Sequence, residues 1–505
     1  MRMRSLVAAT ALVAASPVFA QDLALDRVGG GALGAQVSFP LHGQRSEPYV
    51  VLLDLAEQPT VIPQLGLTLA ISDRFAWFSF TVPSFAGLTD ANGNATASFV
   101  LPNDPTIEPC VFSLQAVAGF GPWRASNLVR VTPQLRGTFK PTLAAPPLPL
   151  AGGGAVPAAD GEVLFVGGSG PIAQRYASRT EDWSLAGGTF GVGLLSQTTP
   201  LADGRVLFTG GLDLATGQPT AAAAVYDPSD GSTTTLTMAS PRAGHGASRL
   251  GNGRVLVTGG FASFDLTNPL SLLQGIQATT EIYDPATDTF LPGPNMLEAR
   301  TLHTSTTLTN GQVLIAGGIT LLPIVNVPIV SSTAYRYDPV GGSFGLPAFF
   351  GGPRFLHSAA ALDDGKVLLA GGLTLDLTTF LQTGNLGDLI VGTRTDCQLY
   401  SVGLFGFGTF TAVEGLQQGR ACAAIAPLPG GRALVAGGFE LIVDPTTQTF
   451  VLAPTASADV FRQGPNAITP TGAMQSPRVF PIATRLPDGT VLVAGGGAGA
   501  EIYER

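Results

Sequence analysis

The stretch that decides the fold is Leu308-Thr-Asn-Gly-Gln-Val-Leu-Ile-Ala-Gly-Gly318, in which a polar turn leads into a short apolar run and a glycine pair. The same pattern occurs six more times along the chain. The other copies are Gly161–Gly168, Gly204–Gly211, Gly253–Gly260, Gly365–Gly372, Gly431–Gly438 and Gly489–Gly496. Successive copies lie roughly 50 residues apart, a period typical of propellers and solenoids.

Each copy carries further shared features after the glycine pair. A tyrosine turn ends the next strand, an aromatic residue follows a polar turn, and Arg-x-x-His opens the next copy. The tyrosine turns are Tyr226-Asp227-Pro228, Tyr283-Asp284-Pro285 and Tyr337-Asp338-Pro339, with Val443-Asp444-Pro445 in the sixth copy and Tyr503 in the last. The late aromatic residues are Trp183, Phe290, Phe344, Phe410 and Phe450. The Arg-x-x-His pairs are Arg242 with His245, Arg300 with His303, and Arg354 with His357.

Together these features resemble the kelch repeat over residues 137–505. The resemblance implies four-stranded antiparallel blades around an axis, and it is closer to galactose-oxidase-like kelch arrays of secreted proteins than to the WD40 type. Because neighbouring blades would pack on both sides of the apolar strand, that strand loses the alternation of a one-sided sheet. We therefore predict an all-β protein with a seven-bladed kelch β-propeller over residues 135–505.

The two ends of the repeat region predict how the ring closes. The last copy reaches Arg505 with its fourth strand missing, whereas Gly137-Thr138-Phe139 matches the late aromatic piece of the other copies. We therefore expect residues 137–141 to supply the outer strand of the seventh blade, which leaves no blade with an unpaired edge.

The first 134 residues differ in pattern from the repeats. Residues 1–20 combine Arg2 and Arg4 with an apolar run and a small-residue cleavage site before Gln21, which predicts a secretory signal peptide and a secreted location (extracellular, cell surface or periplasm). Residues 21–134 predict a small antiparallel β-sandwich that resembles immunoglobulin-like modules. Its expected strands are 36–41, 49–55, 65–71, 76–82, 97–101, 111–118 and 128–131.

Composition limits the classes of partner. The net charge of −9 argues against a nucleic-acid binder, which needs a basic face. The most apolar internal run, Ile319 to Val330, is too short and too interrupted to span a membrane. Three cysteines leave at least one unpaired; Cys397 and Cys422 either pair or are, like Cys110, small buried side chains.

Two groups of residues are candidate ligand contacts on the face that carries the long loops of blades three to five. The loop residues Leu321, Leu322, Ile324 and Val325 predict an apolar patch for a partner, or a lid in which the loops fold onto one another. Arginines that open strands would ring the axis and bind an acidic peptide or a uronic-acid glycan. The alternative is structural pairing with loop carbonyls or with Glu281, Glu440 and Glu501. These arginines are Arg242, Arg300, Arg354, Arg420 and Arg478.

Metal chemistry is not favoured by the sequence. His245, His303 and His357 share one register in successive blades, so a zinc site would require all three to turn inward, and a structural role is preferred. The galactose oxidase resemblance implies copper held by tyrosines and histidines with a cysteine bonded to one tyrosine, and no such arrangement can be assigned. We therefore expect no metal, no cofactor and no catalytic residue.

The leading interpretation is a secreted, non-catalytic binding protein that holds a protein or polysaccharide on the loop face of the propeller. Two alternatives stay open. One is a galactose-oxidase-like or carbohydrate-active enzyme with an unrecognised site, and the other is a structural component of the cell surface or matrix.

Overall fold

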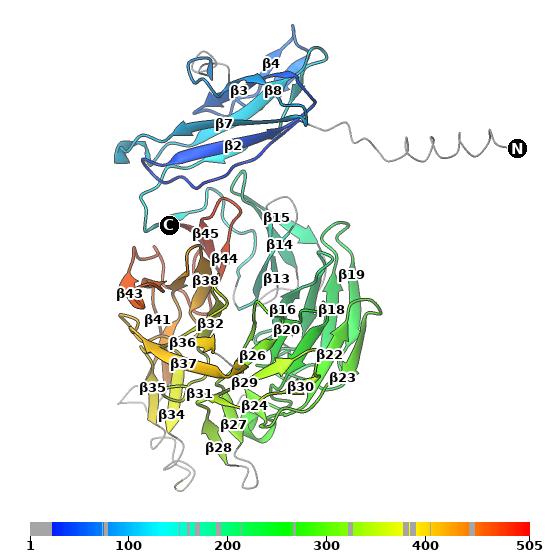
Figure 1. Ribbon diagram of the computed structural model, residues 1–505, viewed down its shortest axis with the longest axis vertical. Helices are drawn as coiled ribbons and strands as arrows, with labels where there is room; N and C mark the ends of the chain where they lie inside the picture. The colour runs from blue at the N-terminus through cyan, green and yellow to red at the C-terminus, as the bar shows by residue number, and fades with distance from the viewer. Residues whose placement is uncertain are drawn as a thin grey trace, which may run out of the picture.

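The computed structural model describes residues 23–505, apart from 73, 75–78, 151, 159–161, 167–171, 188–192, 214, 266–268, 322–326, 377–382, 384–389, 404–405 and 444–449. The expected signal peptide lies outside these residues. The described chain is all-β, and each of its strand pairs is antiparallel. Figure 1 shows a smaller body at the N-terminal end and a larger, ring-like body below it. Among the described residues, no helix has the length and apolar character that crossing a membrane requires.

The N-terminal part is built from two sheets. One has the order β1-β2-β7 and the other β10-β8-β3-β6, with β9 beside β8 and a separate hairpin β4-β5. The strands are β1 (Ala24–Leu25), β2 (Gln36–His42), β3 (Pro48–Asp54), β4 (Thr60–Ile62), β5 (Leu67–Leu69), β6 (Ala86–Leu88), β7 (Asn94–Val100), β8 (Phe112–Ala118), β9 (Arg124–Ala125) and β10 (Val129–Val131), and a 3-10 turn spans Pro105–Ile107. Val37, Phe39 and Leu41 alternate along β2 and face the shared core, as a one-sided sheet requires.

One expected strand of this part is wrong. Residues 79–82, the described end of the predicted strand 76–82, form a turn before Pro83. The pairing with β3 begins only at Ala86, after Phe85 has entered the core. Proline lacks the N–H that a ladder needs, so the apolar run ends in a turn and the strand forms after it.

In the rest of the chain, the described residues form seven four-stranded units of the same order. Their strands are β12 (Gly154–Pro157), β13 (Glu162–Val166), β14 (Ala173–Ala177) and β15 (Asp182–Gly187); β16 (Gln197–Pro200), β17 (Val206–Thr209), β18 (Ala222–Tyr226) and β19 (Thr233–Thr237); β20 (Gly246–Arg249), β21 (Val255–Thr258), β22 (Thr280–Asp284) and β23 (Thr289–Pro292); β25 (Thr304–Thr307), β26 (Val313–Ala316), β29 (Thr333–Asp338) and β30 (Ser343–Phe344), with β31 (Ala348–Phe349) also beside β29; β32 (Ser358–Ala361), β33 (Val367–Ala370), β36 (Cys397–Val402) and β37 (Gly408–Val413); β38 (Ala424–Leu428), β39 (Arg432–Ala436), β42 (Ala458–Arg462) and β43 (Ala467–Pro470); and β44 (Ile482–Arg485), β45 (Val491–Ala494), β46 (Ala500–Glu504) and β11 (Thr138–Pro141).

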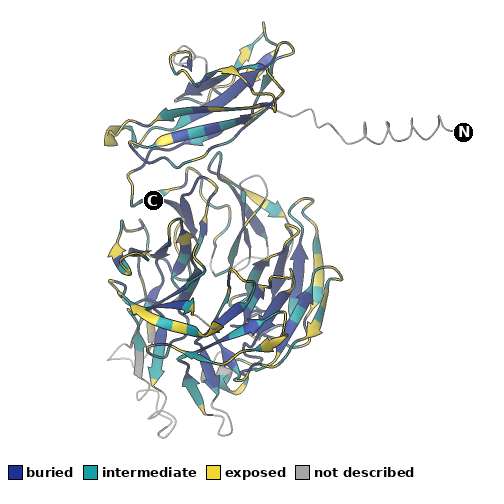
Figure 2. Ribbon diagram, in the orientation of Figure 1, coloured by how far each residue is buried: buried dark blue, intermediate teal, exposed yellow. Residues whose placement is uncertain are grey.

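The units follow one another so that the last meets the first. The first strand of each unit contacts the first strand of the next, from β12 to β44, and β44 also contacts β12. In the seventh unit the outer strand comes from the other end of the region, since β11 pairs with β46 and places Phe139 opposite Tyr503. The second strands are buried on both faces, which explains their continuous apolar sequence (Figure 2).

The glycine pairs allow neighbouring units to approach closely. The N–H of the second glycine donates to the carbonyl of the arginine that opens the next unit, as from Gly260 to Arg300 at 2.9 Å. The first glycine has a positive φ, and a Cβ on Gly259 would lie 2.3 Å from the Arg300 carbonyl oxygen. Only glycine therefore fits at this position.

Two-stranded hairpins are inserted within three of the units, between the second strand and the third. They are formed by β27 (Ile319–Leu321) and β28 (Pro328–Val330), with β24 (Arg300–Thr301) beside β27, by β34 (Leu373–Asp376) and β35 (Ile390–Thr393), and by β40 (Phe439–Val443) and β41 (Phe450–Pro454). The third hairpin corrects the expected register of the sixth copy. Val443 lies in this insertion, and the strand that pairs with β39 is β42.

The N-terminal part is joined to the ring by buried polar contacts. The guanidinium of Arg27 forms an ion pair with Asp488 and donates to the carbonyl oxygen of Arg130. Thr132 donates to the carboxylate of Glu181 at 2.8 Å. Because charged groups are buried only when they are paired, these contacts fix how the first unit and the seventh unit meet the sandwich.

Candidate functional site

A pocket of about 330 Å³ lies where the seven first strands begin. Each unit contributes the residues just before or at the start of its first strand. We call it the histidine pocket. Its lining includes Gly152, Leu195, Gly244, His245, Leu302, His303, Leu356, His357, Cys422 and Phe480. The histidine pocket is therefore lined by equivalent residues from all seven units.

Three imidazoles form part of the wall of the histidine pocket. The Nε2 atoms of His245, His303 and His357 lie 2.8–2.9 Å from the hydroxyls of Thr209, Thr258 and Thr304, respectively. Their Nδ1 atoms are buried and have no hydrogen-bond partner in the described chain. Burial lowers the pKa of His245 and of His357 to about 3, and it lowers the pKa of His303 well below its ordinary value. All three imidazoles are therefore neutral at physiological pH.

The rim of the pocket is held in an unfavourable backbone conformation. The residue one position before the histidine register has a positive φ in every unit, and in five units it is not glycine. These residues are Leu195, Leu302, Leu356, Cys422 and Phe480, with φ between 49° and 61°. Such conformations cost about 1–3 kcal/mol each and are concentrated at functional sites. This strain could not be predicted from the sequence, because leucine and phenylalanine rarely adopt a positive φ and nothing in their spacing indicates one.

Backbone hydrogen bonds connect these rim residues from unit to unit. Gly244 donates to Leu195, Leu302 donates to Gly244, Leu356 donates to Leu302, and Cys422 donates to Leu356, with N···O distances of 2.8–3.1 Å. These hydrogen bonds between neighbouring units explain why the rim residues adopt the strained conformation. The left-handed residue aims its N–H at the neighbouring unit, and the bond that forms offsets part of the strain.

The five arginines that open the units lie inside the protein. Each is at most 1% exposed, and each pairs with a carboxylate from its own unit or from the loop before it. The pairs are Arg242 with Glu281, Arg300 with Glu298, Arg354 with Asp396, Arg420 with Asp459, and Arg478 with Glu501. This is the structural alternative that the sequence left open. Glu440 takes no part, because it lies on the inserted β40.

The apolar loop patch is described only in part. Leu321 is half-buried in a cluster formed by the inserted hairpins, with Ile319, Val330 and Leu373. Leu322, Ile324 and Val325 lie outside the described residues. The hairpin bases therefore pack against one another, and the loop tips stay a prediction.

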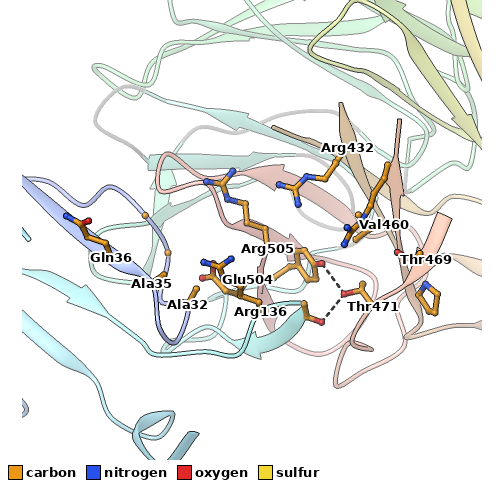
Figure 3. A pocket seen from close by; sticks show the side chains of 16 residues that line it. Ala32, Ala35, Gln36, Arg136, Arg432, Val460, Thr469, Thr471, Glu504 and Arg505 are labelled. Atoms are coloured by element: carbon orange, nitrogen blue, oxygen red, sulfur yellow. Dashed lines mark hydrogen bonds between the residues drawn. The ribbon is translucent and has the colours of Figure 1, made fainter. Parts of the chain in front are cut away.

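A second pocket, of about 680 Å³, lies between the N-terminal part and the last two units. Figure 3 shows Arg432 and Arg505 pointing toward one another across it. We call it the arginine pocket, because Arg136, Arg432, Arg462 and Arg505 all line it. These arginines share no motif, so the sequence did not predict this pocket. The pairing of β39 with β42 places Arg432 opposite Arg462, and the pairing of β11 with β46 brings Arg136 near Arg505.

Glu504 is the acidic residue that lines the arginine pocket. It is 3% exposed, and its Oε2 atom has no hydrogen-bond partner in the described chain. Burial, together with the nearby charge of Asp488, raises the pKa of Glu504 to about 7, although Arg27, the backbone N–H of Gly31 and Arg505 act in the opposite direction. Glu504 therefore changes its charge near neutral pH.

The residues present do not fit the tyrosine–histidine copper centre implied by the galactose oxidase resemblance. All histidines, tyrosines and cysteines of the chain are among the described residues. No tyrosine lines the histidine pocket, and Tyr176, Tyr283 and Tyr400 instead pack against aromatic rings between units. In the part of the chain that the structure describes, no three His, Cys, Asp or Glu side chains are placed to hold a metal. All three cysteines are free, so Cys397 and Cys422 are not paired.

We predict that the three pocket histidines do not titrate between pH 5 and 8. Their lowered pKa values keep the neutral form throughout this range, whereas an unperturbed imidazole titrates near pH 6.5. Imidazole ¹⁵N shifts recorded by NMR on the intact chain check this. Assignment by single His→Gln variants identifies each signal, and a midpoint near pH 6.5 for any of the three would contradict the buried geometry.

We also predict that Glu504→Gln changes how stability depends on pH. The folded protein binds this proton more tightly than the unfolded chain, whose reference pKa is 4.5, so wild-type stability falls as pH rises from about 4.5 to about 7. The loss is about 3 kcal/mol. Urea unfolding at pH 5 and pH 8 measures this loss. Glu504→Gln removes most of the fall, and Glu440→Gln, at a half-buried position of β40, does not. Equal pH dependence in wild type and Glu504→Gln would refute the prediction.

Comparison with known proteins found a similar fold among solved structures. No family model and no curated protein matches this sequence. Among solved structures, the chain is similar to a fungal alcohol oxidase of the AA5 family in complex with copper. The likeness has a TM-score of 0.52 at 18% sequence identity, and it covers 71% of this chain and 74% of the oxidase chain.

This likeness corrects the leading interpretation from the sequence. A non-catalytic binding protein was expected, but the fold is shared with a catalytic, galactose-oxidase-like enzyme. The likeness points to the enzyme alternative rather than to the non-catalytic binding protein. What the comparison establishes is an all-β fold of the galactose-oxidase-like kind.

Proposed function

We propose that residues 135–505 form a seven-bladed kelch β-propeller closed by strand β11, behind an immunoglobulin-like sandwich of residues 21–134. The proposal is supported by seven units of equal strand order and by contacts between first strands that return from β44 to β12. The bonds from glycine pairs to arginines of the next unit occur at equivalent positions in successive units, as expected of a repeat. Export through a signal peptide at residues 1–20 belongs to the same proposal.

We further propose that the protein is an enzyme that acts on an alcohol or carbohydrate in the histidine pocket. The observation that carries this proposal is the ring of five strained, non-glycine residues around three neutral imidazoles. Strain of this kind persists only where the surrounding structure enforces it, and it gathers at active sites. The similar fungal protein is an alcohol oxidase, which supports a substrate that carries a hydroxyl group.

The side chains of the pocket suit such a substrate. Leu195, Leu302, Leu356 and Phe480 give the rim an apolar surface for carbon atoms. His245, His303 and His357 line the pocket, and a substrate hydroxyl would lie against these imidazoles; their Nδ1 atoms are buried and have no hydrogen-bond partner within the described chain. With pKa values near 3, the imidazoles are poor bases at neutral pH, so their role is to orient the hydroxyl and not to remove its proton. No step through copper is derived, because the residues do not fit it.

An activity screen tests this proposal. The mature chain is incubated with primary alcohols and with neutral mono- and oligosaccharides, and products are detected by mass spectrometry with and without a chelator. We expect turnover that the chelator leaves unchanged. Leu302→Phe narrows the pocket without removing a polar group and lowers kcat/KM by at least tenfold, whereas His42→Gln, in the N-terminal part, does not.

Two results would contradict the proposal. One is turnover that Leu302→Phe does not affect although the variant melts at the wild-type temperature, because the reaction would then take place elsewhere. The other is activity that requires stoichiometric copper, because the pocket described above would then not be the reaction centre.

A further inference from the structure

The arginine pocket contains positive charge that the chain does not neutralise. No ion pair of the described residues includes Arg136, Arg432, Arg462 or Arg505. The one hydrogen bond from these guanidiniums within the described chain runs from Arg432 Nε to the carbonyl of Pro429, at 3.0 Å. By contrast, the arginines that open the units are each paired with a carboxylate.

The clustering of these arginines is unfavourable without a ligand. Arg432 on β39 and Arg462 on β42 lie directly opposite one another on neighbouring strands of the sixth unit. Arg505 follows β46 of the seventh unit and faces Arg432 across the pocket (Figure 3). Burial and the charges of Arg505 and Arg462 together lower the pKa of Arg432. The charges of Arg462 and Arg505 therefore act against that of Arg432, and an anion between the guanidiniums would turn this repulsion into attraction.

The remaining lining indicates what kind of anion fits. The volume of about 680 Å³ is far larger than one small ion needs. Thr469 and Gln36 contribute polar side chains that make no hydrogen bond within the described chain, and much of the remaining wall is glycine and alanine. Guanidinium groups bind carboxylates through paired hydrogen bonds, whereas hydroxyl and amide groups suit sugar hydroxyls.

We propose that the arginine pocket is a binding site for an acidic oligosaccharide, with Arg432, Arg462 and Arg505 holding its carboxylates. The site is separate from the histidine pocket and goes beyond the proposed reaction. It is also distinct from the anion site that the sequence suggested, because those five arginines are buried and paired. An acidic glycan bound here would contact both the N-terminal part and the ring, since Gly29, Gln36 and Arg136 line the same pocket.

Glu504 gives this site a defined response to pH. The groups that surround its carboxylate are Asp488, Arg27, Arg505 and the N–H of Gly31. Below pH 7 the carboxyl is neutral and the pocket has its full positive charge. Above pH 7 the ionised carboxylate competes with the ligand for the arginines, so affinity falls as the pH rises. Histidine has no part in this response, because none lines the pocket.

Calorimetric titration of the intact chain tests the proposal with two matched sugars. Trigalacturonate carries three carboxylates, and neutral galactotriose has the same ring size without them. We expect binding of trigalacturonate at pH 6 and low salt, at least tenfold weaker binding in 0.3 M NaCl, and no binding of galactotriose. Affinity at pH 8 is at least threefold lower than at pH 6, and Glu504→Gln removes this difference.

Variants locate the binding. Arg462→Gln and Arg505→Gln each lower the affinity about tenfold or more, whereas Arg249→Gln, an exposed arginine at the end of β20, leaves it unchanged. Neither Arg462 nor Arg505 has an ion pair or side-chain hydrogen bond with the part of the chain that the structure describes, so we expect both variants to fold, and thermal melting checks this. The proposal is overturned if both sugars bind equally, if the pocket variants bind like the wild type, or if inorganic phosphate binds as tightly as trigalacturonate. A short acidic peptide or an oligonucleotide binding more tightly than trigalacturonate would also overturn it.

Discussion

The pairing of β11 with β46 is the contact on which the rest of the structure depends. It joins residues from the start and the end of the repeat region, and it packs Phe139 on Tyr503 at a centroid distance of 5.0 Å. Without it β46 would be an exposed edge, which proteins avoid because unpaired backbone groups there recruit other chains. The pairing also brings Arg136, Glu504 and Arg505 to one place, so the arginine pocket depends on the contact between the two ends of the repeat region.

A second constraint acts between every pair of neighbouring units. The glycine pair lets an arginine carbonyl approach, and the arginine side chain returns to its own unit, as Arg300 does to the carbonyl of Gly317 at 3.0 Å. A buried arginine needs acceptors for most of its five N–H donors. Arg300 finds them in the carbonyls of Gly317 and Thr333 and in the carboxylate of Glu298. The same arrangement sets the position of the first strands, which in turn places the histidines and the strained rim around one pocket.

The sequence predicted the fold correctly where a residue pattern is compatible with only one kind of local structure. Glycine pairs and continuous apolar runs predicted strands buried on both faces, and the structure has them. It failed where a local pattern recurs by coincidence: Val443-Asp444-Pro445 matched the tyrosine turn, but the strand beside β39 is β42. The site was harder still. A positive φ at Leu356 is a consequence of tertiary packing. So are the histidine Nδ1 atoms and the four pocket arginines that have no partner among the described residues, and no spacing along the chain encodes them.

The most direct test of the pairing between β11 and β46 is native-state hydrogen exchange of the intact chain, followed residue by residue along β46. A strand with partners on both sides protects all of its amides, whereas an edge strand protects only every second one. The account predicts that the amides of Ala500 to Glu504 are all as slow to exchange as those of the central strands β33 and β39. If every second amide of β46 instead exchanges as fast as those of the outer strands, β11 does not pair with β46 in solution, and both pockets described above lose their basis.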